Sequence, residues 1–177
     1  MKNTKWNRLS QKVLLNHPRL SVYEDQVELP NGHITNYIHF GANTGASMII
    51  AKLKDGKLLL QREYSYPTDS WLYQFPGGAI EKNETPIQAA DRELAEEAGL
   101  KGSLEKLGFY YPDNRRSGRK MHVFVATELS PVKAEADIEE DIESYWFTEK
   151  EIDKKIKNGE IVNPSALAGW AFYKSQK

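Results

Sequence analysis

Three glutamates, Glu93, Glu96 and Glu97, recur at helical spacing in residues 92–100, which read RELAEEAGL. Positions i, i+3 and i+4 of a helix share one face, so these carboxylates are expected within about 6 Å of one another. Like charges at that spacing repel and destabilise the helix unless a cation neutralises them. Clustered carboxylate oxygens are the hard ligands that Mg²⁺ and Mn²⁺ prefer. The spacing therefore predicts a divalent-metal site on this face.

Both ends of the helix that would carry these glutamates are marked in the sequence. Thr85 is a candidate N-cap, Pro86 occupies the first helical position, and Gln88 completes a capping box with Thr85. Gly99 is placed to end the helix with a left-handed residue. Small or apolar residues recur every four positions on the opposite face, at Ala90, Leu94 and Ala98. We expect that face to pack on a core.

A solvated acidic surface is the simpler explanation of the glutamates, with Arg92 pairing Glu96 at i+4. It explains the charge but not Gly78, Glu84 or the helix caps. The stretch 78–100 reads Gly, five residues, Glu, seven residues, then Arg-Glu-apolar-x-Glu-Glu-x-Gly-apolar. At every fixed position this string is similar to the Nudix box, and the chain therefore resembles the Nudix hydrolases.

This resemblance implies an α/β fold, the Nudix α/β/α sandwich around a mixed β-sheet. It also implies hydrolysis of a phosphoanhydride. Anionic oxygens shield each phosphorus from attack, and divalent ions overcome this by neutralising charge and acidifying water. The expected cofactor is Mg²⁺, with Mn²⁺ possible, in about two or three ions.

The resemblance also assigns metal ligands. Glu93 and Glu97 are expected to bind metal, with Glu96 in or beside the same set of ligands. In Nudix enzymes a carbonyl just ahead of the box helix often joins the metal, and here that position is Gly77. The turn at Gly77 is also explained by a need for positive φ, and the two explanations are compatible.

Four further charged residues receive roles from the resemblance. Arg92 is expected to orient the carboxylates or the box loop, and Glu84 to fix that loop or to act as an outer ligand. Nudix enzymes commonly carry an acidic loop facing the box. Glu139 and Glu140 are candidates for its mobile carboxylate, which would take a proton from water or bind an extra metal. A solvated loop is the alternative.

A basic segment at residues 111–120 lies between two predicted strands and contains Arg115, Arg116, Arg119 and Lys120. One interpretation is a solvated hairpin tip. The other is a cationic loop that binds the diphosphate or a terminal phosphate through the arginines, with Tyr110 or Tyr111 stacking on a base.

The N-terminal region is rich in strand-forming residues. Runs at 20–29 and 34–40 flank Pro30-Asn31-Gly32 and predict a hairpin. The arrangement resembles the N-terminal sheet of ADP-ribose pyrophosphatases, which swaps across a homodimer. It implies a dimerisation and substrate unit at 1–43, a Nudix hydrolase domain at 44–177, and a homodimer.

Further elements follow from hydrophobic pattern and turn residues. Strands are predicted at 47–53, 57–64, 104–110, 121–127 and 144–147. Asp55-Gly56 predicts a tight turn from which the second of these strands returns. A capping box at Thr148 opens a helix that Asn158-Gly159 closes, and Asn163-Pro164 opens a last helix.

The substrate indicated by the resemblance is ADP-ribose or another sugar linked to a nucleoside diphosphate. Cleavage would give a nucleoside monophosphate and a sugar phosphate. The chain departs from many ADP-ribose enzymes, reading Glu63-Tyr64-Ser65 for their Gln-Tyr-Arg and QFPGG at 74–78 for their ELPAG. A hydrolase of nucleoside triphosphates or dinucleoside polyphosphates therefore stays open, as does a non-catalytic module that binds a nucleotide sugar.

Composition excludes several other classes of protein. The chain has 177 residues, a net charge of −1 and no cysteine. One domain of this length buries a sizeable core, and the charge gives no argument for nucleic-acid or membrane binding. Without cysteine there is no disulfide, zinc–thiolate site or thiol nucleophile. Since no long apolar run or leader is visible, we expect a cytoplasmic protein with a small-molecule substrate.

Overall fold

The computed structural model describes residues 5–41, 45–133 and 142–176. These residues form two compact units. The first contains the N-terminal strands together with residues 113–119, and the second contains the remaining described residues.

The first unit is an antiparallel sheet in the order β1-β2-β3, formed by β1 (Asn7–His17), β2 (Leu20–Glu28) and β3 (Ile34–Phe40). The predicted hairpin is confirmed as β2 and β3, and Gly32 turns between them with φ +81°. Sequence pattern missed β1, which reads NRLSQKVLLNH without clean alternation and is exposed throughout. Residues 113–119 join this unit through the Phe40 amide, which donates to the Arg116 carbonyl at 2.7 Å.

The second unit contains two sheets. A mixed sheet has the order β7-β4-β9-β8, with β4 and β9 parallel and the other neighbours antiparallel. Its strands are β4 (Ala46–Ala51), β7 (Gly77–Ala79), β8 (Leu100–Tyr110) and β9 (Met121–Pro131). The other sheet is antiparallel, in the order β10-β5-β6. It consists of β5 (Leu58–Ser65), β6 (Ser70–Gln74) and β10 (Ile142–Phe147), and the short helix η1 (Tyr66–Thr68) links β5 to β6.

The strands on either side of Asp55-Gly56 do not form the regular hairpin that a tight turn suggests. The turn is present, since the Leu53 amide donates to the Lys57 carbonyl at 2.9 Å. Beyond a single bridge between Lys52 and Leu58, however, β4 and β5 enter different sheets. β4 and the first three residues of β5 are buried on both faces, so each strand gains more by lying inside a sheet than by pairing only with the other.

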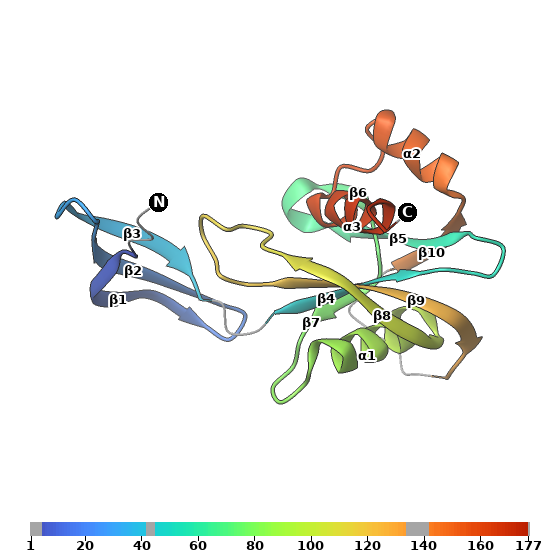
Figure 1. Ribbon diagram of the computed structural model, residues 1–177, viewed down its shortest axis with the longest axis horizontal. Coiled ribbons are helices and arrows are strands. Elements are labelled where there is room, and N and C mark those ends of the chain that lie inside the picture. Colours follow the sequence, from blue (N-terminus) through green and yellow to red (C-terminus); the bar gives the residue numbers. More distant parts are fainter. Residues whose placement is uncertain (1–4, 42–44, 134–141, 177) are drawn as a thin grey trace. The chain divides into compact units, whose positions relative to one another are not determined.

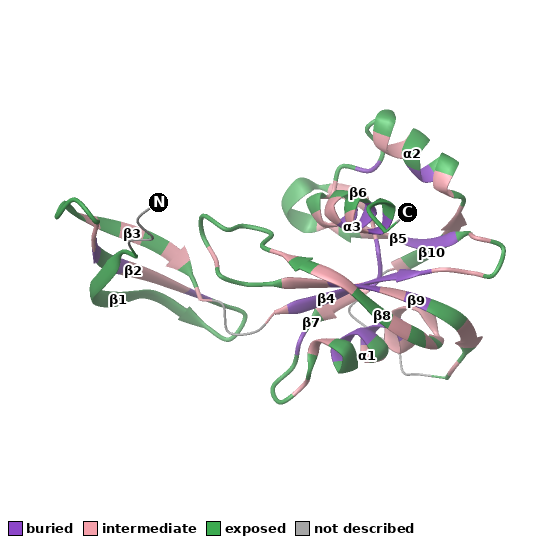
Figure 2. Ribbon diagram, viewed as in Figure 1, coloured by how far each residue is buried: buried purple, intermediate pink, exposed green. Residues whose placement is uncertain are grey.

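Helices cover both sides of these sheets, which confirms the predicted α/β class (Figure 1). Helix α1 (Pro86–Ala98) packs on one side through Ala90 and Leu94, against Leu59 and Phe124. Helices α2 (Glu149–Lys157) and α3 (Pro164–Lys174) cover the other core. Figure 2 shows buried residues concentrated in β4, β5 and the inner face of α1. Among the described helices, none has the length and apolar character needed to cross a bilayer.

Candidate active site

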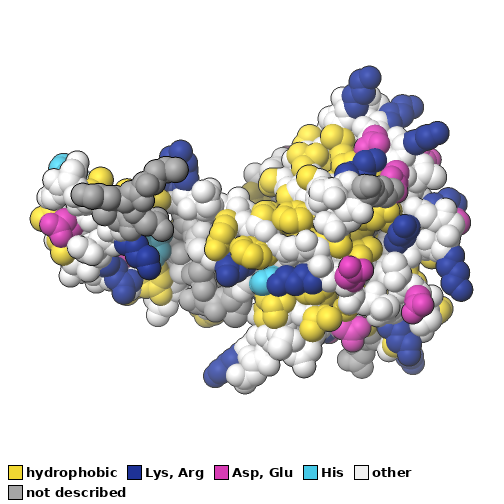
Figure 3. Space-filling model, viewed as in Figure 1, with side chains coloured by type: hydrophobic (Ala, Val, Ile, Leu, Met, Phe, Trp, Pro, Cys, Tyr) yellow, Lys and Arg dark blue, Asp and Glu magenta, His cyan; other side chains and the backbone are white. Residues whose placement is uncertain are grey.

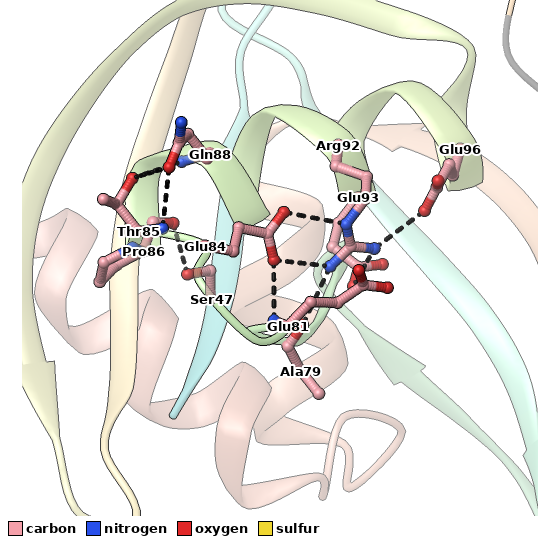
Figure 4. A network of polar contacts seen from close by, with 10 residues as sticks. All are labelled: Ser47, Ala79, Glu81, Glu84, Thr85, Pro86, Gln88, Arg92, Glu93 and Glu96. Atoms are coloured by element: carbon pink, nitrogen blue, oxygen red, sulfur yellow. Dashed lines mark hydrogen bonds and ion pairs between the residues drawn. The ribbon is translucent and has the colours of Figure 1, made fainter. Parts of the chain in front are cut away.

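Helix α1 is fixed at both ends as its sequence predicts. The Thr85 side chain accepts from the Gln88 amide at 3.4 Å, and the Gln88 side chain accepts from the Thr85 amide at 2.9 Å (Figure 4). Gly99 ends the helix in the left-handed region, with φ +62°. The buried Ser47 hydroxyl donates to the Pro86 carbonyl at 2.7 Å and so ties the start of α1 to β4.

Arg92 joins three glutamates and the loop before the helix. Its guanidinium contacts both carboxylate oxygens of Glu84, through Nε at 3.0 Å and Nη2 at 3.2 Å. Nη1 donates to Glu93 and to Glu96 at 2.9 Å each, and Nη2 also donates to the Ala79 carbonyl at 3.0 Å (Figure 4). With all these donors committed to the protein, Arg92 serves to orient carboxylates and loop.

The pKa values in this cluster follow from the same contacts. The hydrogen bond from Arg92 holds the pKa of Glu84 below its ordinary value, and the pKa of Arg92 is raised chiefly by that bond. Glu84 also accepts from the Glu81 amide at 2.9 Å, so it closes the loop that leads into the helix. Glu84 is therefore ionised and acts on the loop.

Glu97 and Glu93 each lie against one of the two glycines ahead of the helix, Gly77 and Gly78 respectively. The Gly77 amide donates to Glu97 Oε2 at 3.0 Å. At Gly78 an added Cβ would lie 2.3 Å from Glu93 Oε1, so only glycine leaves room for that carboxylate. Glu93 is buried, with 8% of its surface exposed, and burial raises its pKa. Two carboxylates from successive helical turns therefore converge on one short strand, β7.

This donor set suits a hard divalent cation. Glu93, Glu96, Glu97 and the Gly77 carbonyl offer only oxygen, the ligand atom that Mg²⁺ and Mn²⁺ favour. Within the described ranges, no three His, Cys, Asp or Glu side chains are grouped closely enough to hold a metal. Arg92 Nη1 holds the carboxylates of Glu93 and Glu96 at 2.9 Å each. The chemistry of the residues thus fits the expected metal.

The acidic loop candidates Glu139 and Glu140 lie outside the residues that the structure describes. The two tyrosines differ in their surroundings. Tyr110 packs against the core under α3, with its ring 6.2 Å from that of Phe172, and burial raises its pKa. Tyr111 is exposed and its ring meets that of Phe109 edge-on at 5.8 Å. Of the two, only Tyr111 offers a surface on which a base could stack.

Within the basic segment, residues 115–119 make contacts inside the N-terminal unit. Arg116 Nη1 donates to the Ile38 carbonyl at 3.1 Å, and the Tyr37 hydroxyl donates to the Arg115 carbonyl. The Arg119 amide donates to the Ser117 hydroxyl at 3.1 Å. The segment is therefore anchored to β3 as well as being a hairpin tip. Substrate binding by its arginines stays a prediction.

Gln61 is a buried polar residue that the sequence pattern did not single out. Gln61 on β5 is fully buried, and its Nε2 donates to the backbone carbonyl of Glu97 at 3.3 Å. Its Oε1 has no hydrogen-bond partner among the described residues. In the sequence, the one indication of this residue is a glutamine that directly follows the apolar run LLL at 58–60. Gln61 thus links β5 to the turn of α1 that carries Glu97.

Comparison with known proteins finds relatives along most of the chain. An ADP-ribose pyrophosphatase of Bacillus subtilis (strain 168) is 27% identical over 164 residues, covering 91% of this chain and 88% of the relative. An ADP-ribose pyrophosphatase of Mycobacterium tuberculosis (strain ATCC 25618 / H37Rv) is 30% identical over 175 residues, covering 91% and 79%.

A solved structure has the same fold. A crystal structure of an ADP compounds hydrolase superposes with a TM-score of 0.89 at 24% identity, covering 98% of this chain and 94% of the other. The family model described as NUDIX domain matches residues 43–167, which include β4, α1 and both glycines of β7. The box and the fold thus agree, and the chain belongs to the NUDIX domain family.

Proposed function

We propose that this protein is a metal-dependent hydrolase that cleaves the diphosphate linkage between a nucleoside and a sugar. The products would be a nucleoside monophosphate and a sugar phosphate. The observation that carries the proposal is the convergence of Glu93 and Glu97 on Gly77–Gly78, beside Arg92. The substrate class is supported by two relatives named ADP-ribose pyrophosphatase.

The described residues supply binding and orientation for this reaction. Glu93, Glu96, Glu97 and the Gly77 carbonyl would hold Mg²⁺ or Mn²⁺, in about two or three ions. When bound, such ions neutralise the anhydride oxygens and acidify a water molecule. Arg92 keeps two of the carboxylates in place through its fixed fork of donors. Glu139 or Glu140 would accept the proton from the attacking water.

A substrate panel tests the proposal directly. Nucleoside diphosphate sugars, nucleoside triphosphates and dinucleoside polyphosphates are each incubated with Mg²⁺ and with Mn²⁺, and the products are identified. We expect a nucleoside monophosphate plus a sugar phosphate, no turnover in EDTA, and recovery when metal is restored. Full turnover in the chelator would overturn the metal mechanism, and no cleavage of any compound would favour a binding module.

Hydrolysis of triphosphates or dinucleoside polyphosphates is the second candidate. It is favoured by the residues QFPGG at 74–78 and by Ser65, where an arginine is common among ADP-ribose enzymes. The same panel decides the question, because these substrates would release pyrophosphate or a nucleotide and no sugar phosphate.

We also propose that the protein is a homodimer joined through its N-terminal strands. Large apolar side chains on this sheet are strongly exposed: Leu9, Val13, Leu15, Leu20, Ile34 and Ile38. A single sheet that leaves such residues in water gains stability when a second surface covers them. The exposure supports an interface on this sheet.

A further inference from the structure

A polar pocket of about 300 Å³ lies beside the ends of β5 and β6 in the second unit. Glu63, Ser65, Gln74 and Asn163 are among its lining residues. Alternate residues of a strand share a face, so Glu63 and Ser65 point to the same side of β5 as Gln61. Gln61 bonds to the backbone of Glu97. Gln74, which lines the pocket, is the cross-strand partner of Gln61, so the pocket is linked through Gln61 to the turn of α1 that carries Glu97.

A chain of hydrogen bonds runs along the pocket wall, in which Asn163 donates to Gln74 and Gln74 donates to Glu63. Asn163 caps α3, and its Oδ1 accepts from the amides of Ser165 at 2.8 Å and Ala166 at 3.4 Å. Its Nδ2 is thereby turned outward and donates to Gln74 Oε1 at 3.4 Å. The Gln74 amide must then present Nε2, which donates to Glu63 Oε2.

This chain determines what the pocket offers to a ligand. Because the helix cap orients both amides, Gln74 Nε2 donates to Glu63, and the carboxylate oxygens of Glu63 offer a ligand hydrogen-bond acceptors. A ligand that donates hydrogen bonds is accommodated by the Glu63 carboxylate, whereas one that only accepts is not. Through these hydrogen bonds, the N-cap of α3 leaves the Glu63 carboxylate as a hydrogen-bond acceptor in the pocket.

Charge points to the same kind of ligand. Among the described residues that line the pocket, none is lysine or arginine. The nearest arginine along the strand, Arg62, projects to the opposite face of β5, where it lies 5.4 Å from the Trp71 ring centre and 3.6 Å from Glu143. A phosphate or carboxylate would meet the Glu63 charge with no cation to offset it.

We propose that this pocket binds the neutral, hydroxyl-bearing sugar of the substrate and discriminates against a sugar that carries a negative charge. Sugar hydroxyls donate to the Glu63 carboxylate, and Tyr66 at the pocket edge, 86% exposed, supplies an aromatic surface for the ring. The inference rests on the proposed cleavage of nucleoside diphosphate sugars and names the group that this site takes.

The test compares two substrates that differ only in charge on the sugar. The wild-type protein, with Mg²⁺, is given a nucleoside diphosphate hexose and the corresponding hexuronate, in which a carboxylate replaces the hydroxymethyl group. We expect kcat/KM to favour the hexose by at least ~10-fold. Glu63→Gln should lower kcat/KM for the hexose by about tenfold, mainly through KM, and should narrow the preference against the hexuronate.

Two further variants separate binding from folding. Glu143→Gln removes a carboxylate from the neighbouring strand on the opposite face, where it pairs with Arg62, and should leave the preference unchanged. In the double variant Glu63→Gln with Gln74→Glu, Asn163 still has an acceptor, and the pocket regains its charge. We expect this variant to recover part of the discrimination against the hexuronate.

The outcomes distinguish this inference from the proposed function. Cleavage of hexose and hexuronate within twofold of each other, with Glu63→Gln unchanged, overturns the sugar pocket and leaves the hydrolase intact. Equal losses in Glu63→Gln and Glu143→Gln also overturn it, because the effect would then not belong to the pocket. If no nucleoside diphosphate sugar is cleaved, the proposed function fails and this inference fails with it.

Discussion

At the scale of single residues, Gly78 and Gly77 are required for different reasons. Gly78 leaves room for a side chain of the candidate site, whereas Gly77 leaves room for the backbone of the fold. A Cβ at Gly78 would lie 2.3 Å from Glu93 Oε1, which is the mobile end of a side chain. A Cβ at Gly77 would lie 2.2 Å from the Ser47 backbone oxygen, at φ +149°. The first collision can be relieved by moving a carboxylate, and the second cannot be relieved without moving β4.

We therefore predict opposite outcomes for the two alanine variants. Gly78→Ala should fold normally and lose at least ~100-fold in kcat, the order lost with one electrostatic group of a site. Gly77→Ala should be destabilised, because both the φ angle and the backbone contact oppose it. Steady-state kinetics and thermal melting measure both. Normal turnover in folded Gly78→Ala would show that the position of Glu93 is not critical.

Glu97 provides a direct test of the predicted metal ligands. Glu97→Gln keeps an oxygen that can accept from the Gly77 amide, so the fold is retained while a charged ligand is removed. We expect kcat to fall by at least ~100-fold and Mn²⁺ binding, followed by calorimetry, to weaken. Near-normal activity would remove Glu97 from the ligand set.

The guanidinium of Arg116 in the basic segment donates to the Ile38 carbonyl on β3. If the arginines of this segment also bind a phosphate, Arg115→Ala or Arg116→Ala should raise KM more than it lowers kcat. The expected effect is about 1.5–3 kcal/mol, the range for a charged hydrogen bond. The same comparison covers Arg119→Ala, and a KM within twofold of wild type in all three would assign the segment to structure alone.

At the scale of elements, helices α1 and α2 both begin with a capping box but have different roles in the protein. In α1, Thr85 accepts from the Gln88 amide, and in α2, Thr148 accepts from the Glu151 amide, both at 3.4 Å. Helix α1 holds the box glutamates, whereas α2 covers the core on the other side. The pair offers a matched comparison of stability with activity.

Thr85→Ala and Thr148→Ala should each cost about 1 kcal/mol of unfolding free energy, the usual value of an N-cap. Only Thr85→Ala should also lower kcat, because fraying of α1 loosens the loop that Glu84 and Arg92 close. Urea unfolding and initial rates measure the two effects. An equal loss of activity in both variants would mean that stability alone sets the rate.

At the scale of the whole molecule, the N-terminal sheet exposes several large hydrophobic side chains. Hydrophobic side chains appear among the charged ones on the visible surface of this unit (Figure 3). The side chains of Val13 and Leu15 on β1 are 56% and 47% exposed. Such a sheet is expected to bury these residues against a partner.

We predict that the protein is a dimer at micromolar concentration and that Val13→Glu with Leu15→Glu gives monomers. Burying two charges in the interface would cost more than the sheet gains there. Sedimentation velocity measures the assembly, and truncation of residues 1–43 should likewise give monomers or aggregates. A wild type that sediments as a monomer would remove the dimer and leave the enzyme proposal unaffected.

Short-range chemistry let the sequence predict α1, α2 and α3 with their caps. A capping box, a proline at the first helical position and a left-handed glycine act within a few residues, so Thr85, Pro86 and Gly99 could be interpreted without knowing what surrounds them. The spacing of Glu93, Glu96 and Glu97 is equally local, since a helix alone puts them on one face.

The tertiary structure decided which distant segments meet those residues. Strand pairing depends on contacts far apart in the chain, so no local pattern revealed that β4 and β5 enter different sheets or that residues 113–119 bind to β3. No local pattern revealed that Gly78 lies against Glu93 or that Gln61 bonds to the backbone of Glu97. The hydrogen-bond chain from Asn163 to Glu63 likewise joins residues that are far apart in the sequence. Sequence determined the spacing of the three glutamates because a helix arranges its own side chains. The fold determined their surroundings because only packing brings separate strands together.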